Sequence, residues 1–222
     1  MSSLETQMAT RREQILESAR RLIESDGYEG LSMRVLAAES NVTVPTIYNL
    51  VGNKEEVFFA AVEEQTHTFV ANLERAAGDL VAVVEASVRQ LVRRPRYYRT
   101  LLLVFANSEG SDSASRHVGR ALETQLHRGV EEVSGAGDLL DLVEIEIVAQ
   151  RLRAHFDMAS LEWARGSLTA ASFRAAALFD MASLMLGLTR GASQRNFERI
   201  VRENASDARR RGASGATKGR AA

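Results

Sequence analysis

Apolar residues recur at helical spacing along most of the chain, and glycine or small polar residues separate the runs. Ile15, Ala19 and Ile23 share one face of the first run, which is the pattern of an amphipathic helix. This spacing predicts a helix over residues 11–26. Gly27 ends the helix, because glycine adopts the left-handed conformation of a helix C-terminus without steric cost.

Three more helices follow, each preceded by a residue that caps helix N-termini. Ser32, Thr43 and Asn53 each carry a side-chain oxygen that accepts a hydrogen bond from a free backbone amide, and Glu56 is placed to complete a capping box with Asn53. Asn41 tolerates the left-handed conformation needed in the turn between the first two. The predicted ranges are 33–40, 44–51 and 54–77. Two short helices joined by a turn of three or four residues form a helix-turn-helix.

The remainder of the chain shows longer amphipathic runs. Pro95 begins one of them, and the first helical turn is where its missing N–H costs nothing. The predicted helices span residues 80–93, 95–107, 113–133, 139–165, 168–189 and 194–205. The fold class is therefore all-α, with an N-terminal three-helix helix-turn-helix domain that a long fourth helix joins to a larger helical domain.

Composition narrows the functional classes. The sequence has no cysteine, which excludes disulfide scaffolds, thiol catalysis and thiolate metal sites. The N-terminus has no apolar core of a signal peptide, and no apolar run approaches the length of a membrane span. We expect a cytoplasmic protein without a membrane partner, associated with the nucleoid when bound to DNA.

Net charge argues against a nucleic-acid partner unless the few cations are well placed. The whole chain carries −1, and residues 1–65 carry six Arg/Lys against eleven Asp/Glu, a net −5. A DNA-binding hypothesis must therefore rest on the positions of individual cations. Arg34 and Lys54 both stand at predicted helix starts beside the helix-turn-helix.

The third predicted helix has one apolar and one polar side. Ile47 points toward the first two helices, whereas the opposite side presents hydroxyl, amide and aromatic groups. Asn49 suits adenine, and Thr46 suits a base edge or a thymine methyl. The candidate DNA-binding residues are Ser32, Arg34, Thr43, Val44, Pro45, Thr46, Tyr48, Asn49 and Lys54. Val44 and Pro45 offer apolar contact to thymine methyls, and the remaining residues suit phosphates. The alternative is a surface helix whose polar face binds nothing.

Residues 11–58, and especially the run LSMRVLAAESNVTVPTIYNLVGNKEEVF at 31–58, resemble the DNA-binding domain of the TetR family of bacterial transcription regulators. The matching residues are Ser32, Arg34, Val42, Thr43, Thr46, Ile47, Tyr48, Lys54 and Glu55. The resemblance implies that the third helix reads the major groove while Tyr48 and Lys54 contact phosphates. Two departures occur: Asn41 replaces the turn glycine, and Leu50-Val51 replaces a frequent His-Phe pair, which removes one polar contact to DNA.

The same resemblance implies the organisation of the whole chain. It predicts a flexible arm at residues 1–10, a DNA-binding domain at 11–58, an effector-binding and dimerisation domain at 59–205, and a disordered basic tail at 206–222. We expect a transcription regulator that binds a palindromic operator as a homodimer and is released by an unknown small-molecule effector. Most members of the family are repressors, so the resemblance favours a repressor.

Two sets of residues are candidates for dimerisation and effector binding. A stripe of small residues suggests close approach of the last long helices to a second subunit: Ala171, Ala175, Phe179, Ala182 and Leu186. The candidate effector pocket comprises Tyr97, Tyr98, Leu102, Phe105, His155, Met158 and Trp163. Burial inside one subunit is the alternative for both sets.

An enzyme is the main competing class. The sequence lacks a phosphate loop, a metalloprotease motif and a nucleophile elbow, and the histidines show no metal-ligand spacing. We therefore expect no catalytic residues, no metal and no cofactor. An all-helical enzyme or carrier domain, and a protein-binding helical scaffold, remain alternatives.

Overall fold

The structure is a computed structural model that describes residues 3–76, 78–107 and 113–208. Ten helices occur within these residues: α1 (Ser3–Gly30), α2 (Met33–Glu39), α3 (Val44–Leu50), α4 (Lys54–Glu74), α5 (Leu80–Arg93), α6 (Pro95–Asn107), α7 (Ser113–Gly135), α8 (Ile145–Ala164), α9 (Ala170–Leu186) and α10 (Gly191–Ala208). The predicted all-α class is confirmed. In this part of the chain, no helix combines the length and the apolarity that crossing a membrane requires.

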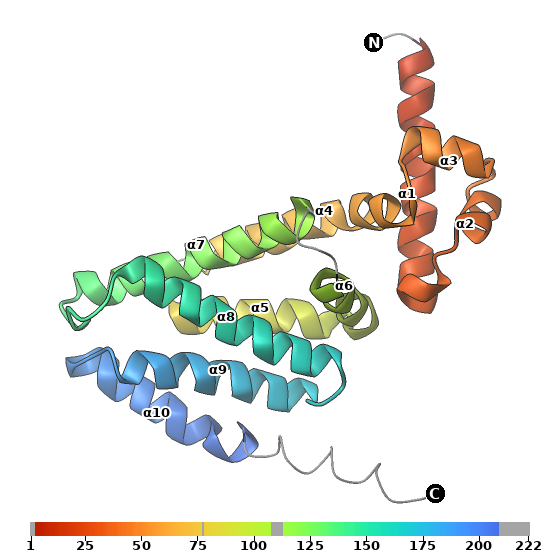
Figure 1. Cartoon of the computed structure of the whole chain (residues 1–222). Helices are drawn as coiled ribbons and strands as arrows, with labels where there is room; N and C mark the ends of the chain where they lie inside the picture. The colour runs from red at the N-terminus through yellow and green to blue at the C-terminus, as the bar shows by residue number, and fades with distance from the viewer. Residues whose placement is uncertain (1–2, 77, 108–112, 209–222) are drawn as a thin grey trace, which may run out of the picture.

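The three N-terminal helices form a small head at one end of the molecule (Figure 1). Its core contains fully buried Ile15, Ile23, Leu36 and Ile47, contributed by α1, α2 and α3. Gly27 kinks α1, with φ 71° and ψ −167°, as expected for the left-handed glycine. The helix nevertheless starts at Ser3 instead of residue 11 and includes residues 28–30 beyond the kink.

The predicted caps that space the helix-turn-helix are present. The Ser32 hydroxyl accepts from the Val35 amide at 3.2 Å. Asn53 completes the capping box with Glu56, because Asn53 Oδ1 accepts from the Glu56 amide at 3.0 Å while Glu56 Oε2 accepts from the Asn53 amide at 2.7 Å. Asn41 has φ 51°, the only positive value among the described non-glycine residues. These local bonds set where α2, α3 and α4 begin.

Helix α4 leads from the head into a larger body made of the remaining helices (Figure 1). Helix α7 packs on α4 and α8, and α6 packs on α8 and on α1 of the head. Helix α9 is enclosed by α5, α8 and α10, which all pack against it. The interior of the body therefore centres on α8 and α9.

The connection before α8 differs from the prediction. Residues 139–144 are not helical, since Leu139 forms an isolated antiparallel bridge with Thr189 and α8 begins only at Ile145. Beside this bridge, the Asp138 carboxylate accepts from the Ser193 amide at 2.8 Å. This hydrogen bond holds the start of α10 in place. Helix α10 runs to Ala208 and therefore includes residues 206–208 of the predicted tail. Residues 209–222 lie outside the described part of the chain.

Candidate nucleic-acid interface

Helix α3 has the two-sided arrangement that recognition of a groove requires. Ile47 is fully buried on the side facing α1 and α2, with Val44 and Leu50 half-buried at its margins. Tyr48 on the opposite side is 54% exposed, and Asn49 is also exposed. Apolar burial thus fixes the orientation of α3 in the head and leaves its polar side free for a partner.

The start of α3 carries two threonines whose hydroxyls are linked. Thr43 Oγ1 and Thr46 Oγ1 lie 2.8 Å apart, and Thr43 Oγ1 also accepts from the Thr46 amide at 3.4 Å. Pro45 stands beside them in the first turn and is exposed. The pair holds both side chains at the helix N-terminus, where backbone amides and hydroxyls favour an anion or a base edge.

The cations of the head divide into paired and unpaired ones. Arg20 bonds Glu13 at 2.6 Å, and Arg21 lies 3.6 Å from Glu17. By contrast, neither Arg34 nor Lys54 forms an ion pair with any residue that the structure describes. Two carboxylates of α1 are thus paired with arginines, whereas Arg34 and Lys54, at the starts of α2 and α4, have no ion-pair partner among the described residues.

Lys54 has a partner of another kind. Its Nζ lies 4.1 Å from the centre of the Tyr28 ring. The ring edge of Tyr28 in turn contacts Phe58, with centroids 5.1 Å apart and planes at 85°. Tyr28 was not among the predicted site residues, because it lies 26 positions before Lys54 and only the kink in α1 brings them together.

The residues predicted to line an effector pocket differ in burial. Tyr97, Tyr98 and Trp163 are buried in the body, and Leu102 and Phe105 are half-buried. The prediction was wrong for His155 and Met158: both are exposed, Met158 by 59%, because they lie on the side of α8 opposite its buried residues.

Several buried polar atoms of the body have no hydrogen-bond partner among the residues that the structure describes. They include the Tyr97 hydroxyl on α6, Nε of Arg99 on α6 and Oε1 of Gln125 on α7. Burial raises the pKa of the Tyr97 hydroxyl far above its ordinary value, so it stays a neutral donor and acceptor. The Arg99 guanidinium lies 4.9 Å from the Trp163 ring. Arg99 and Gln125 were missed by the sequence analysis, which had no signal for a buried polar group on a mixed helix face.

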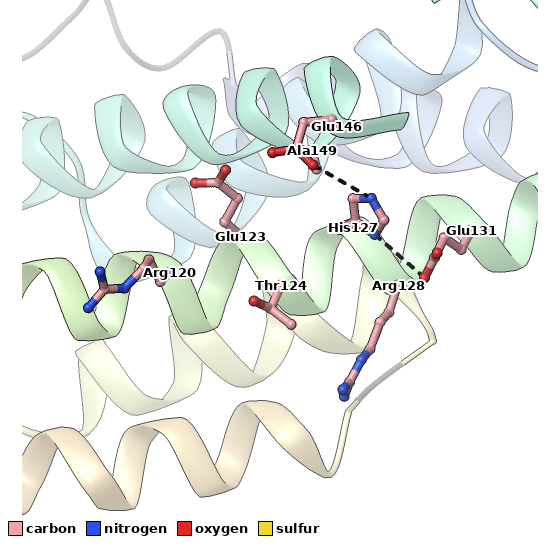
Figure 2. Close-up of a pocket in the computed structure, with 8 residues that line it drawn as sticks. All are labelled: Arg120, Glu123, Thr124, His127, Arg128, Glu131, Glu146 and Ala149. Atoms are coloured by element: carbon pink, nitrogen blue, oxygen red, sulfur yellow. Dashed lines mark ion pairs between the residues drawn. The ribbon is translucent and has the colours of Figure 1, made fainter. Parts of the chain in front are cut away.

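A separate polar hollow of about 360 Å³ opens between α7 and α8 (Figure 2). His127 stands in it between two carboxylates, with Nδ1 3.5 Å from Glu131 and Nε2 3.9 Å from Glu146. Among the residues that the structure describes, no three histidine or acidic side chains gather in a group suited to a metal ion. The predicted pocket residues do not line this hollow.

The predicted dimer stripe needs correction. Ala175 is 4% exposed and Ala182 is fully buried inside the chain, because α5, α8 and α10 enclose α9. Ala171 is exposed, while Phe179 and Leu186 are half-buried. The small residues of α9 thus serve close packing within one chain.

An exposed stripe on α8 was missed. Ile147 and Met158 are 45% and 59% exposed, with exposed Arg151 and Ala154 between them at intervals of three or four residues. Leu142 and Val143, just before α8, are also exposed, by 66% and 42%. The positions four and seven residues after Ile147 could have predicted this exposed stripe from the sequence. The residues of α8 were instead interpreted as part of an effector pocket, because the helix also contains aromatic residues.

Comparison with known proteins finds a family match in the head. Residues 15–61 match the family model described as bacterial regulatory proteins, tetR family. The HTH-type nicotine-responsive transcriptional repressor HdnoR of Paenarthrobacter nicotinovorans is 32% identical over 65 residues, which are 29% of this chain and 34% of that repressor. The chain thus matches about a third of the length of this relative.

Solved structures share the fold of both parts. SmeT, the repressor of the Stenotrophomonas maltophilia multidrug efflux pump SmeDEF, aligns with a TM-score of 0.63 at 20% identity, covering 82% of this chain and 92% of SmeT. RolR in complex with resorcinol aligns with a TM-score of 0.63 at 16% identity, covering 89% of this chain and 95% of RolR. The likeness extends from the head through the body.

Proposed function

We propose that this chain, whose residues 15–61 match the model of the tetR family of bacterial regulatory proteins, is a transcriptional repressor. It binds a palindromic operator as a homodimer and leaves it when a small molecule enters the body. The observation that carries this proposal is the exposed polar side of α3, flanked by two cations without ion-pair partners among the described residues.

The head separates groups that grip DNA from groups that read it. Arg34 and Lys54 stand at helix starts, where phosphates approach backbone amides and a positive dipole end. Thr46 in the first turn of α3 and Asn49 near its end are proposed to reach base edges when the helix enters the major groove. Affinity for any DNA then depends on the cations, and preference for one sequence depends on α3.

A single head reads only half of a palindrome, so we assign the dimer contact to the α8 stripe. Ile147, Ala154 and Met158 repeat at the spacing with which two helices pack side by side. The stripe of α9 is already covered within the chain, so the α8 stripe is the better candidate for contact with a second copy. Such a dimer must hold its two α3 helices about 34–36 Å apart, one turn of DNA.

The effector is proposed to bind inside the body, between α6, α7 and α8. Oε1 of Gln125 and Nε of Arg99 are buried polar atoms without hydrogen-bond partners among the described residues, and such atoms are stabilised when a ligand supplies the missing bond. The buried Trp163 ring, 4.9 Å from the Arg99 guanidinium, provides apolar surface beside it. The relatives respond to nicotine or bind resorcinol, which favours a small ring compound with few polar groups.

Fluorescence anisotropy with the promoter fragment of its own gene tests DNA binding. Lys54→Ala should weaken binding to the operator and to random DNA alike and lower the salt slope by about one unit. Arg202→Ala is the matched control, because Arg202 is an exposed cation paired with Glu198 on α10, outside the head. If the wild-type chain binds neither DNA, or if both variants behave alike, the assignment of the head as the DNA-binding surface is wrong.

Sedimentation velocity tests the dimer. Met158→Glu introduces a charge at the C-terminal end of the α8 stripe and should yield monomers, whereas Met8→Glu changes an exposed methionine of α1 and should leave the dimer intact. A Met158→Glu variant that remains dimeric would place the contact on another surface.

A further inference from the structure

The contact between Lys54 and Tyr28 joins the start of α4 to the end of α1. The ammonium stands over the ring at 4.1 Å from its centroid. The ring is itself fixed, because its edge packs on fully buried Phe58. A lysine side chain has four rotatable bonds and loses considerable freedom when its ammonium is held in one place. Tyr28 thus restricts a side chain that would otherwise sample many positions.

The surroundings of Tyr28 strengthen the attraction. Burial raises the pKa of the Tyr28 hydroxyl, and the nearby carboxylates of Glu55 and Glu29 raise it further. The phenol therefore stays neutral. The electron-rich face of its ring and the two nearby carboxylates together give this place a negative potential. The ring face and the two carboxylates both favour a cation at this place.

The position of the ring depends on the kink in α1. Gly27 has φ 71°, a conformation that other residues adopt only with strain. A Cβ at Gly27 would also lie 3.3 Å from Thr100 Oγ1 on α6. The kink therefore turns Tyr28 toward α4 at the point where head and body meet.

We propose that Tyr28 is a positioning residue for DNA binding: its ring holds the Lys54 ammonium at the N-terminus of α4, ready for a backbone phosphate. This inference rests on the proposed function. A cation on a ring face keeps its three N–H donors, and those directed away from the ring remain available for phosphate oxygens. Tyr28 acts through Lys54 and need not touch DNA.

A double-mutant cycle on random-sequence duplex DNA tests the proposal. Tyr28→Leu keeps apolar bulk but removes the ring face, and Lys54→Met keeps the length of the side chain but removes the charge. Tyr28→Leu should weaken binding about two- to fivefold when Lys54 is present, the range expected for an exposed cation–π contact. It should have no further effect in the Lys54→Met background. Tyr28→Phe, which keeps the ring, should bind like the wild type.

A second measurement does not depend on the folding of any variant. Lys54 and Lys218 are the two lysines of the sequence, so selective ¹³C-lysine labelling of the full chain gives two sets of signals. The ring should shift the ε-methylene protons of Lys54 upfield relative to those of Lys218. Equal shifts for both lysines would overturn the proposal.

The outcomes separate this inference from the proposed function. A wild-type chain that binds no DNA refutes the proposed function and the inference together. Normal wild-type binding with no loss in Tyr28→Leu, or with the same loss in both Lys54 and Lys54→Met backgrounds, refutes the inference alone. In the latter case Tyr28 would serve the head only as a packing residue.

Discussion

A substitution at Ala182 can show whether the small residues of α9 pack within the chain or against a second subunit. Its side chain is fully buried, and α9 packs against α5, α8 and α10. Ala182→Asp would place a carboxyl group in this apolar site. A buried carboxyl stays neutral, and protonating a group whose ordinary pKa is about 3.9 costs about 4 kcal/mol at pH 7. The larger side chain adds about 1–3 kcal/mol of overpacking.

Thermal unfolding at low protein concentration measures this cost. For a chain of this size the combined cost of about 5–7 kcal/mol corresponds to a fall in Tm of about 10–28 °C. The carboxyl pKa is raised in the folded state, so the protonation penalty is full at pH 7 and shrinks as pH falls toward the unfolded value. It should be about 1.5 kcal/mol at pH 5. Ala182→Asn, a neutral side chain of the same shape, should show a deficit that does not change between these pH values.

Ala171→Asp supplies the matched control on the same helix. Ala171 is exposed in the first turn of α9, where a negative charge is favourable, so its Tm should stay near that of the wild type. An Ala182→Asp variant with wild-type Tm that sediments as a monomer would refute the reasoning. It would show that Ala182 faces a second subunit and that the close packing of α9 on its neighbours is wrong.

Four further outcomes are expected. Asn49→Ala should cost about 1–3 kcal/mol on the operator, concentrated at one base pair per half-site in binding to single-base operator variants; an equal loss on random DNA would make Asn49 a phosphate ligand. Ile47→Ala should lower the free energy of unfolding by about 2–5 kcal/mol in denaturant titrations, since Ile47 is fully buried in the head. The Ser193 amide lowers the pKa of Asp138 below 3.8, so its stabilisation is present above that pH and lost as pH falls through the lowered pKa; Asp138→Asn should remove this dependence from unfolding curves between pH 2 and pH 5. Truncation after Ala208 removes five Arg/Lys and no acid, so it should flatten the salt dependence of DNA binding and leave operator preference and Tm unchanged.

Local signals in the sequence were sufficient for the head. Ser32, Thr43 and Asn53 determine where α2, α3 and α4 begin through bonds to amides three residues away, and such short-range bonds can be predicted from spacing alone. The left-handed conformation of Asn41 in the turn between α2 and α3 could likewise be predicted from the residue type and its position. The two sides of α3 followed from helical periodicity, since Ile47 alone is fully buried in that helix.

Tertiary structure decided which helix faces are covered. A stripe of alanines suits close packing against any helix, so Ala175 and Ala182 gave no means of distinguishing α10 of the same chain from a second subunit. His155 and Met158 likewise turned outward because the rotation of α8 depends on the neighbours it packs against. The contact of Lys54 with Tyr28 required the kink at Gly27. Periodicity shows that a helix has faces, but the identity of the partner on each face depends on contacts between residues distant in the chain.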